Sequence, residues 1–273
     1  MDINKEKFDF VCSLGGNCMA ASQLQQRGLR TFSLPFDWLY MKQNEIVLYG
    51  LIECFKNNFT NFMIKKNMHF IPQEEFPNNG HPDRVFYQDT ETKYYFLNHF
   101  DNELDVDNEF EKVKEKIDRR INRFLNCINN SNKILFLLSH SFFIENQPYI
   151  DFYNFLKEFY PNKEIFIKSI QFNSKDEIKK FENVEIVRYK RVSNLYDYVK
   201  TNYEWNFLDN IEINRKLIKK EINREYGVKL LRFLKLKKGF AFEILPFLNS
   251  MISSKLYIFG IRLNLSIGKM KNE

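Results

Sequence analysis

Hydrophobic and polar positions along the chain repeat with two periods, one typical of strands and one typical of helices. Short apolar runs bounded by turn residues predict strands at 7–14, 93–100, 133–140, 163–170 and 184–190. The run ILFLL within 133–140 is continuous rather than alternating. A continuous run is typical of a central strand that is covered on both faces.

Helical repeats fall between most of these runs. Ala20, Ala21 and Leu24 form the apolar face of a helix that begins near Asn17 and ends at Gly28. Further helices are predicted at 45–62, 107–126, 149–160 and 175–181. Strands that alternate with helices imply right-handed crossovers and a mostly parallel sheet. The predicted fold class is therefore α/β, a three-layer sandwich with a mostly parallel sheet.

Two segments depart from this alternation. Residues 71–92 carry three of the seven prolines and an Asn-Asn-Gly turn, which predicts a long loop or a hairpin. Beyond Trp205 the pattern changes to a basic helical region and a tail that alternates apolar and polar residues. We therefore expect an α/β domain over 1–204 and a basic C-terminal region over 205–273.

The positive charge of the chain is concentrated in one segment. The net charge is +6, yet residues 215–238 alone hold ten Lys or Arg and two Glu, a local charge of +8. The rest of the chain is weakly acidic, which gives no reason to expect nucleic acid. Apolar residues interleave with the cations, so this segment could lie on an anionic membrane or form a solvated outer helix.

The cysteine usage and the first residues favour a reducing compartment. Four cysteines stand at 12, 18, 54 and 127 with no paired CxxC spacing, and the first ten residues lack an apolar stretch of signal-peptide length. We expect a cytoplasmic protein that could also make peripheral contact with the inner face of the membrane. His and Cys occur singly and GGN matches no phosphate-binding motif, so neither a metal nor an organic cofactor is expected.

Cys18 is the first candidate for chemistry. It follows a Gly15-Gly16 turn and stands at the predicted start of a helix. Unpaired N–H groups and the positive end of the helix dipole favour a thiolate there, and the thiolate is the nucleophilic form. The alternative is a small apolar residue that packs the first helical turn.

A thiolate nucleophile usually needs a base, and four histidines are available. His99 ends a predicted strand, with Asp101 two residues later, and strand ends are where active sites of α/β sheets assemble. His140 also ends a strand and is the main competitor, whereas His69 and His81 lie in or near the long loop. Each of them could instead be an ordinary structural histidine.

Asp37 and Arg30 are the charged candidates near the first helix. Asp37, in the segment SLPFDW, could orient a histidine or bind substrate, or it could cap a helix that begins at Trp38. Arg30 could meet an anionic group of a substrate or lie on the surface.

The run SLGGNCMAASQLQQRGLRTFSLPFDW at Ser13–Trp38 resembles the signature of a bacterial family of unknown function that is described as papain-like cysteine peptidases. The segments LNHFDN and RRINRFLNCI extend the resemblance to roughly residues 8–190. The positions that fall in register with the signature are Gly15, Asn17, Cys18, Gly28, Arg30, Ser33, Pro35, Phe36, Asp37 and Trp38.

The resemblance implies Cys18 as nucleophile, His99 as general base and an aspartate, Asp37 or Asp101, as its orienter. Phe100 stands between His99 and Asp101, so the position of the acidic residue departs from the family pattern. The residues then expected to line the substrate site are Gly16, Asn17, Arg30, Ser33, Trp38 and His140.

Three functions follow from these features. The first is a cysteine-dependent hydrolase or acyl transferase acting on a peptide, a glycan or a small molecule. The second is a transferase of lipopolysaccharide or capsule assembly that uses a sugar nucleotide or another phosphorylated donor, because the tail SKLYIFGIRL resembles those of bacterial surface-glycan glycosyltransferases. The third is a non-catalytic assembly module, which predicts that Cys18, His99 and Asp37 lie far apart.

Overall fold

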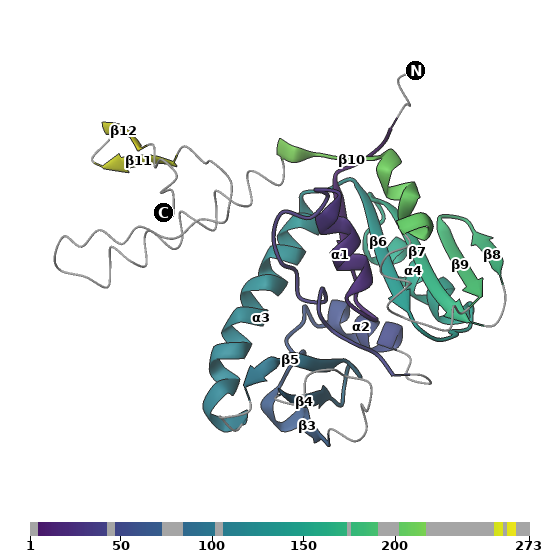
Figure 1. Cartoon of the computed structure of the whole chain (residues 1–273), viewed down its shortest axis with the longest axis horizontal. Coiled ribbons are helices and arrows are strands. Elements are labelled where there is room, and N and C mark those ends of the chain that lie inside the picture. Colours follow the sequence, from purple (N-terminus) through teal and green to yellow (C-terminus); the bar gives the residue numbers. More distant parts are fainter. Residues whose placement is uncertain are drawn as a thin grey trace, which may run out of the picture. The chain divides into compact units, whose positions relative to one another are not determined.

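The computed structural model describes residues 5–42, 47–72, 84–101, 106–173, 176–190, 202–216, 254–258 and 261–265. The chain divides into two compact units, residues 1–224 and 225–273 (Figure 1). Among the described residues, the first unit holds every helix, all the sheets but one and every candidate residue of the site. In the second unit, β11 (Ser254–Ile258) and β12 (Ile261–Leu265) form an antiparallel pair in the tail.

A five-stranded sheet lies at the centre of the first unit. Its strands, in spatial order, are β2 (Phe10–Ser13), β6 (Lys133–His140), β7 (Glu164–Asn173), β9 (Val184–Lys190) and β8 (Glu177–Phe181). The first four strands are parallel, and β8 runs antiparallel to β9. The α/β class with a largely parallel sheet is therefore confirmed.

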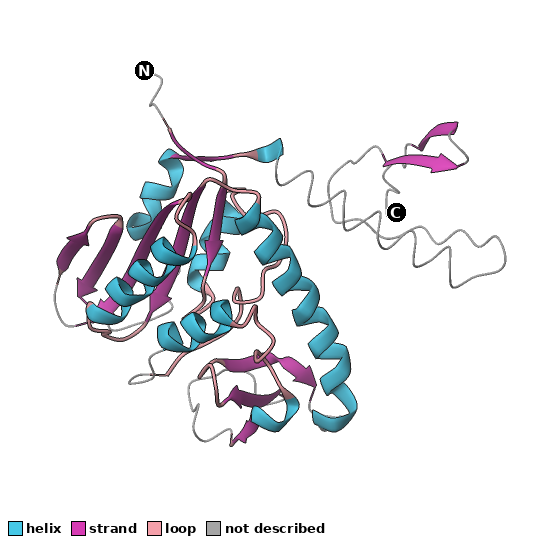
Figure 2. Ribbon diagram, turned by 180° about the vertical axis from the view of Figure 1, so that it is seen from behind, coloured by secondary structure: helices cyan, strands magenta, loops and turns pink. Residues whose placement is uncertain are grey.

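Helices cover both faces of this sheet. Those of the first unit are α1 (Met19–Gln26), α2 (Val47–Lys56), α3 (Val106–Asn129) and α4 (Gln147–Phe159), with the 3₁₀ helices η1 (Lys65–Asn67) and η3 (Asn202–Asn210). Figure 1 shows α1 on one face, and Figure 2, seen from behind, shows α2 and α4 on the other. The predicted three-layer arrangement is therefore present.

The alternation of side chains along β6 explains why both faces are apolar. Leu135 and Leu137 pack with α1 and with Trp205 of η3, whereas Phe136 and Leu138 belong to the cluster that α2, α3 and α4 cover. Successive side chains of a strand point to opposite faces, so a strand between two helical layers needs a continuous apolar run. A short parallel pair, β1 (Glu6–Phe8) with β10 (Ile211–Ile213), extends the layer of η3.

A smaller antiparallel sheet packs beside α3. Its strands are β3 (Met68–Ile71), β4 (Arg84–Asp89) and β5 (Tyr95–Asp101). The predicted strand at 93–100 is thus confirmed as β5. The predicted loop or hairpin at 71–92 holds β4 and the end of β3, while residues 73–83 lie outside the described residues.

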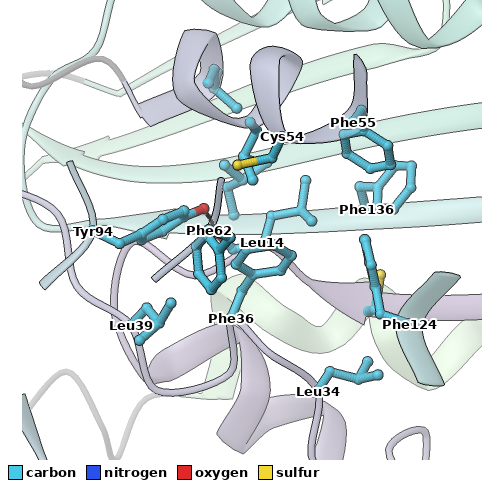
Figure 3. Close-up of a cluster of buried hydrophobic side chains, with 14 of the residues drawn as sticks. Leu14, Leu34, Phe36, Leu39, Cys54, Phe55, Phe62, Tyr94, Phe124 and Phe136 are labelled. Carbon is cyan, nitrogen blue, oxygen red and sulfur yellow. Dashed lines mark hydrogen bonds between the residues drawn. The ribbon is translucent and has the colours of Figure 1, made fainter. Parts of the chain in front are cut away.

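Aromatic side chains join the two sheets into one core (Figure 3). Phe36 lies with its ring centroid 5.4 Å from those of Tyr94 and Phe124 and 5.7 Å from that of Phe62. The buried Tyr94 hydroxyl donates a hydrogen bond of 2.6 Å to the carbonyl of Leu14. The segment around Phe36 is therefore anchored to both sheets at once.

The predicted helix at 175–181 is wrong, because Glu177–Phe181 form strand β8. Its five residues pair in register with β9, from Glu177 opposite Arg188 to Phe181 opposite Val184. The strand lies at the edge of the sheet, where Ile178 and Lys180 are exposed and the other three side chains are only partly buried. Edge strands commonly carry such residues, which hide the strand period from a reading of the sequence.

The predicted basic segment 215–238 lies outside the described residues except for Arg215 and Lys216. Its membrane contact therefore stays a prediction. Among the described helices, none is both long and apolar enough to cross a bilayer.

Candidate active site

A double-glycine turn connects β2 to α1 at the carboxyl end of the parallel strands. Gly15 and Gly16 have φ of +83° and +93°, a backbone conformation that residues with a side chain rarely adopt. The Leu14 N–H donates to the Leu137 carbonyl at 2.8 Å, and the Ser139 N–H donates to the Gly15 carbonyl at 3.3 Å. The turn therefore continues alongside the end of β6.

Cys18 occupies the N-cap position of α1, directly after this turn. Its carbonyl accepts the Ser22 N–H at 3.0 Å, which starts the helix. The Asn17 side chain accepts the Met19 N–H at 2.9 Å, so Asn17 caps the helix from one residue outside it. The remaining first-turn N–H groups have no intrahelical partner, because the helix offers none to its first residues. Cys18 therefore stands at the end of the helix where N–H groups lack intrahelical acceptors.

Cys18 differs from the other three cysteines in its exposure. Cys12, Cys54 and Cys127 are buried, whereas Cys18 is half-buried. Burial raises the pKa of Cys12 well above its ordinary value and also raises the pKa of Cys54. Buried thiols of this kind are inert, which leaves Cys18 as the accessible one.

Tyr40 is a neighbour of Cys18 that the sequence did not suggest. Its backbone forms an isolated bridge with Gly16, two residues before Cys18. Burial, and after it the charge of the Cys18 thiolate, raises the pKa of Tyr40. The phenol is therefore neutral at physiological pH.

His140 is the histidine that lies against the glycine turn. A methyl group on Gly16 would lie 2.3 Å from the Ser139 carbonyl oxygen and 2.7 Å from His140 Nδ1. His140 is fully buried, and burial lowers the pKa of His140 to about 3. Within the described part of the chain its two ring nitrogens have no hydrogen-bond partner, and neither does the Ser139 hydroxyl. The imidazole is thus neutral at physiological pH.

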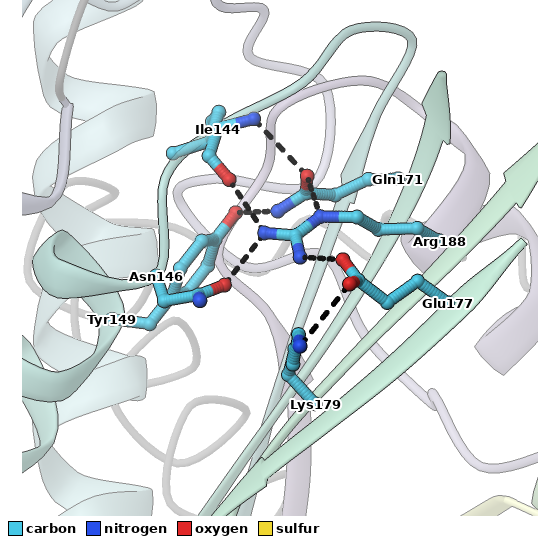
Figure 4. Close-up of polar contacts among 7 residues, drawn as sticks. All are labelled: Ile144, Asn146, Tyr149, Gln171, Glu177, Lys179 and Arg188. Carbon is cyan, nitrogen blue, oxygen red and sulfur yellow. Dashed lines mark hydrogen bonds and ion pairs between the residues drawn. The ribbon is translucent and has the colours of Figure 1, made fainter. Parts of the chain in front are cut away.

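A buried polar network fixes the loop that follows His140 (Figure 4). The Arg188 guanidinium donates to the Ile144 carbonyl at 3.0 Å and to Asn146 Oδ1 at 2.6 Å, and it pairs with Glu177 at 2.6 Å. The Gln171 side-chain oxygen accepts the Ile144 N–H at 3.0 Å. Residues 141–146 are therefore tied to β7, β8 and β9.

The same network reaches the ring of His140. The Gln171 amide donates to the Tyr149 hydroxyl at 3.2 Å, and the Ser169 hydroxyl donates to it at 2.9 Å. The Tyr149 ring centroid lies 6.2 Å from that of His140, in a T-shaped arrangement. The Tyr149 side chain that packs next to the His140 ring is therefore itself held by two hydrogen bonds.

Asp37, a predicted site residue, is fully buried in a clamp of its own segment. Its Oδ2 accepts hydrogen bonds from Arg30 Nη1 at 2.5 Å and from the Leu34 N–H at 2.8 Å. Burial raises the pKa of Asp37, although the Arg30 charge and these hydrogen bonds oppose that rise. The Arg30 guanidinium also lies 5.3 Å above the Trp38 ring. The clamp fixes the chain just before Tyr40.

Ser33 belongs to this clamp through its backbone. Its carbonyl accepts a hydrogen bond from Arg123 of α3. The Arg123 guanidinium also lies 4.9 Å from the Phe32 ring centroid, so α3 holds the start of the SLPFDW segment.

His99, the base that the resemblance implies, lies further along β5. Its ring is buried at 5.5 Å from that of Phe96 and lines a cavity of about 380 Å³ with side chains of α3. Tyr95 is paired with Tyr40, and His99 follows four residues later, which corresponds to about 13 Å of strand. Asp101 ends β5, and its side chain lies outside the described residues.

The contacts given above for Cys18, Asp37 and His99 involve different neighbouring residues. The wide separation that the non-catalytic alternative expects stays a prediction. The structure instead brings Cys18 together with Gly16, Asn17, Tyr40 and the turn against which His140 packs. Within the described residues no group of three or more His, Cys, Asp or Glu is arranged to hold a metal ion.

A family model described as "Putative papain-like cysteine peptidase (DUF1796)" matches residues 9–173, more than half of the chain. The match spans the glycine turn, α1, the SLPFDW segment and β6. Neither the curated proteins nor the solved structures give a significant match.

Proposed function

The chain belongs to this family, and we propose that it is a cysteine-dependent hydrolase or acyl transferase with Cys18 as its nucleophile. One observation carries the proposal: of four cysteines, Cys18 alone is not buried, and it stands at the start of a helix. Open α/β sheets bind ligands at the carboxyl ends of their strands, which is where this helix begins.

The reaction would run in two steps. The Cys18 thiolate attacks a carbonyl carbon, a C–S bond forms, and the carbonyl π electrons move onto oxygen. When the tetrahedral intermediate collapses, the bond to the leaving group breaks, and that group takes a proton from the general acid. Water or another nucleophile then releases the acyl group. Backbone N–H groups of the first helical turn, such as that of Ala20, would stabilise the oxyanion.

His140 is the general base that we propose for this reaction. Its ring packs against Gly16, two residues before Cys18, and its nitrogens are neutral. The negative charge of a thiolate nearby favours the imidazolium form, which compensates for part of the effect of burial. His99 as base, with Asp37 or Asp101 as its orienter, remains a prediction from the resemblance. The glycan-transferase and assembly-module functions also remain predictions, as alternatives to the hydrolase.

Hydrolysis of p-nitrophenyl acetate, a simple acyl donor, tests the proposal without knowledge of the natural substrate. We expect Cys18→Ala to abolish hydrolysis and His140→Gln to reduce it at least about 100-fold, the usual contribution of a general base. Cys54→Ala, which removes a buried thiol, should retain activity. Full hydrolysis by Cys18→Ala would refute the nucleophile, and a loss confined to His99→Gln would transfer the role of base to His99.

A further inference from the structure

The cavity beside His99 lies where β5 packs against α3 (Figure 1). Its volume of about 380 Å³ falls within the range of pockets that hold small molecules, about 300–1,000 Å³. Apart from His99, every residue that lines it belongs to α3: Glu109, Lys112, Val113, Glu115, Lys116 and Arg119. Three of these side chains are cationic, so the charge of the wall indicates what the cavity could hold.

The cations of this wall follow the helical repeat. Lys112, Lys116 and Arg119 are spaced by four and three residues, so they lie one above another on a single face of α3. Arg120 does not line the cavity, but it stands four residues after Lys116 and continues the same face by one turn. Four basic side chains therefore follow one another along about 12 Å of helix.

Two carboxylates line the same cavity and balance these cations only in part. The buried Glu109 pairs with Lys112 at 3.9 Å. The exposed Glu115 stands four residues before Arg119, a spacing at which opposite charges can meet on a helix. Among the described residues, no ion pair links Lys116 to a carboxylate. Lys116 is therefore the cation of the wall that lacks a matching anion.

The surroundings of Lys116 and Arg120 favour an additional negative group. Lys116 is half-buried, and burial, followed by the charge of Arg120, lowers the pKa of Lys116. The charge of Glu109 opposes this shift without cancelling it. Arg120 Nη1 is buried and has no hydrogen-bond partner within the described part of the chain. A charged acceptor is the group that stabilises such donors most.

We propose that this cavity binds a small molecule that carries a phosphate group, and that Lys116 and Arg119 hold the phosphate. A phosphate dianion brings more charge than a carboxylate. Its oxygens accept two parallel hydrogen bonds from a guanidinium, while lysine binds them as a point charge. Val113 and the His99 ring line the same cavity and would contact the rest of the molecule. The inference goes beyond the proposed function and does not rest on Cys18.

Isothermal titration calorimetry with phenyl phosphate as the probe tests this site. We expect saturable binding that weakens as sodium chloride is added, because salt screens the attraction between the charges. Benzoate, which presents a carboxylate on the same ring, should bind more weakly. Lys116→Gln and Arg119→Gln should each weaken the binding of phenyl phosphate about tenfold or more, the usual contribution of a hydrogen bond to a charged group. Arg119 is exposed, so Arg119→Gln decides the question if Lys116→Gln fails to fold.

Lys56→Gln is the matched control, since Lys56 is an exposed lysine at the end of α2 that pairs with Glu53 at 2.7 Å. We expect its affinity for phenyl phosphate to equal that of the wild type. Cys18→Ala should also bind with unchanged affinity, so this result is separate from the hydrolysis assay that tests the proposed function. The inference would be overturned by a lack of saturable binding, by folded Lys116→Gln and Arg119→Gln variants with wild-type affinity, or by benzoate binding as tightly as phenyl phosphate.

Discussion

Gly16→Ala tests the close approach between the glycine turn and the end of β6. The added methyl group would lie 2.3 Å from the Ser139 carbonyl oxygen, a backbone atom that cannot move aside by itself. It would also lie 2.7 Å from His140 Nδ1. The φ of +93° adds backbone strain, because a side chain is disfavoured there. Both costs fall on one residue.

Gly28→Ala separates these two costs. Gly28 has φ +66°, and a methyl group there would meet nothing within 4 Å. We expect Gly28→Ala to lose about 1–2 kcal/mol of stability from the left-handed backbone alone. Gly16→Ala should lose about 2–5 kcal/mol, because overpacking adds about 1–3 kcal/mol to the strain.

The measurement is urea denaturation followed by the fluorescence of the fully buried Trp205. The expected result is a free energy of unfolding for Gly16→Ala at least about 1 kcal/mol below that of Gly28→Ala. Equal losses in the two variants would show that backbone strain alone decides the cost. The contact of Gly16 with Ser139 and His140 would then not be as close as described.

Two further predictions concern buried charge. Burial lowers the pKa of His140 to about 3, against about 6.5 for an unfolded histidine. Below about pH 6.5 the unfolded chain therefore binds a proton that the folded chain does not, and the protein loses stability as the pH falls toward about 3. The free energy of unfolding of the wild type relative to His140→Gln should therefore fall by up to about 4–5 kcal/mol over that range, and a difference that is constant with pH would contradict it. Asp37→Asn should cost about 3–5 kcal/mol in urea denaturation, because it leaves the buried Arg30 unpaired, whereas Asp118→Asn on the exposed Lys114 pair should cost less than about 1 kcal/mol. Equal costs would mean that the Arg30 clamp is no stronger than a surface pair.

Most of the fold could be predicted because its periodic signals are strong. The predicted strands at 133–140 and 184–190 match β6 and β9 residue for residue. A buried strand needs a short apolar run, whereas a helix of the same length does not, so the two can be told apart from the sequence. The stripe of 107–126 likewise marks α3. β8 was missed because an edge strand is only partly buried, so its apolar residues are too few to show a period.

The site could be predicted only where the chemistry is local. Cys18 is recognisable because the glycine turn and the helix start are neighbours in sequence. The contact of Gly16 with His140 joins residues more than 120 positions apart, and the bridge at Tyr40 is a single residue long. Neither leaves a periodic pattern, so both depend on the tertiary fold. The sequence also does not distinguish a buried clamp from an active-site acid at Asp37, because both use the same residue types.

Strand β8 is an edge to which a strand of another copy could be added. It is the last strand of the five, and none of the described strands pairs with its outer side. Lys179 and Lys180 stand on that edge, and Lys179 pairs with Glu177 at 3.1 Å. A second chain that added its own β8 would bring the same lysines together and would have to desolvate them. The edge is thereby protected against strand-to-strand aggregation, a hazard of any open sheet.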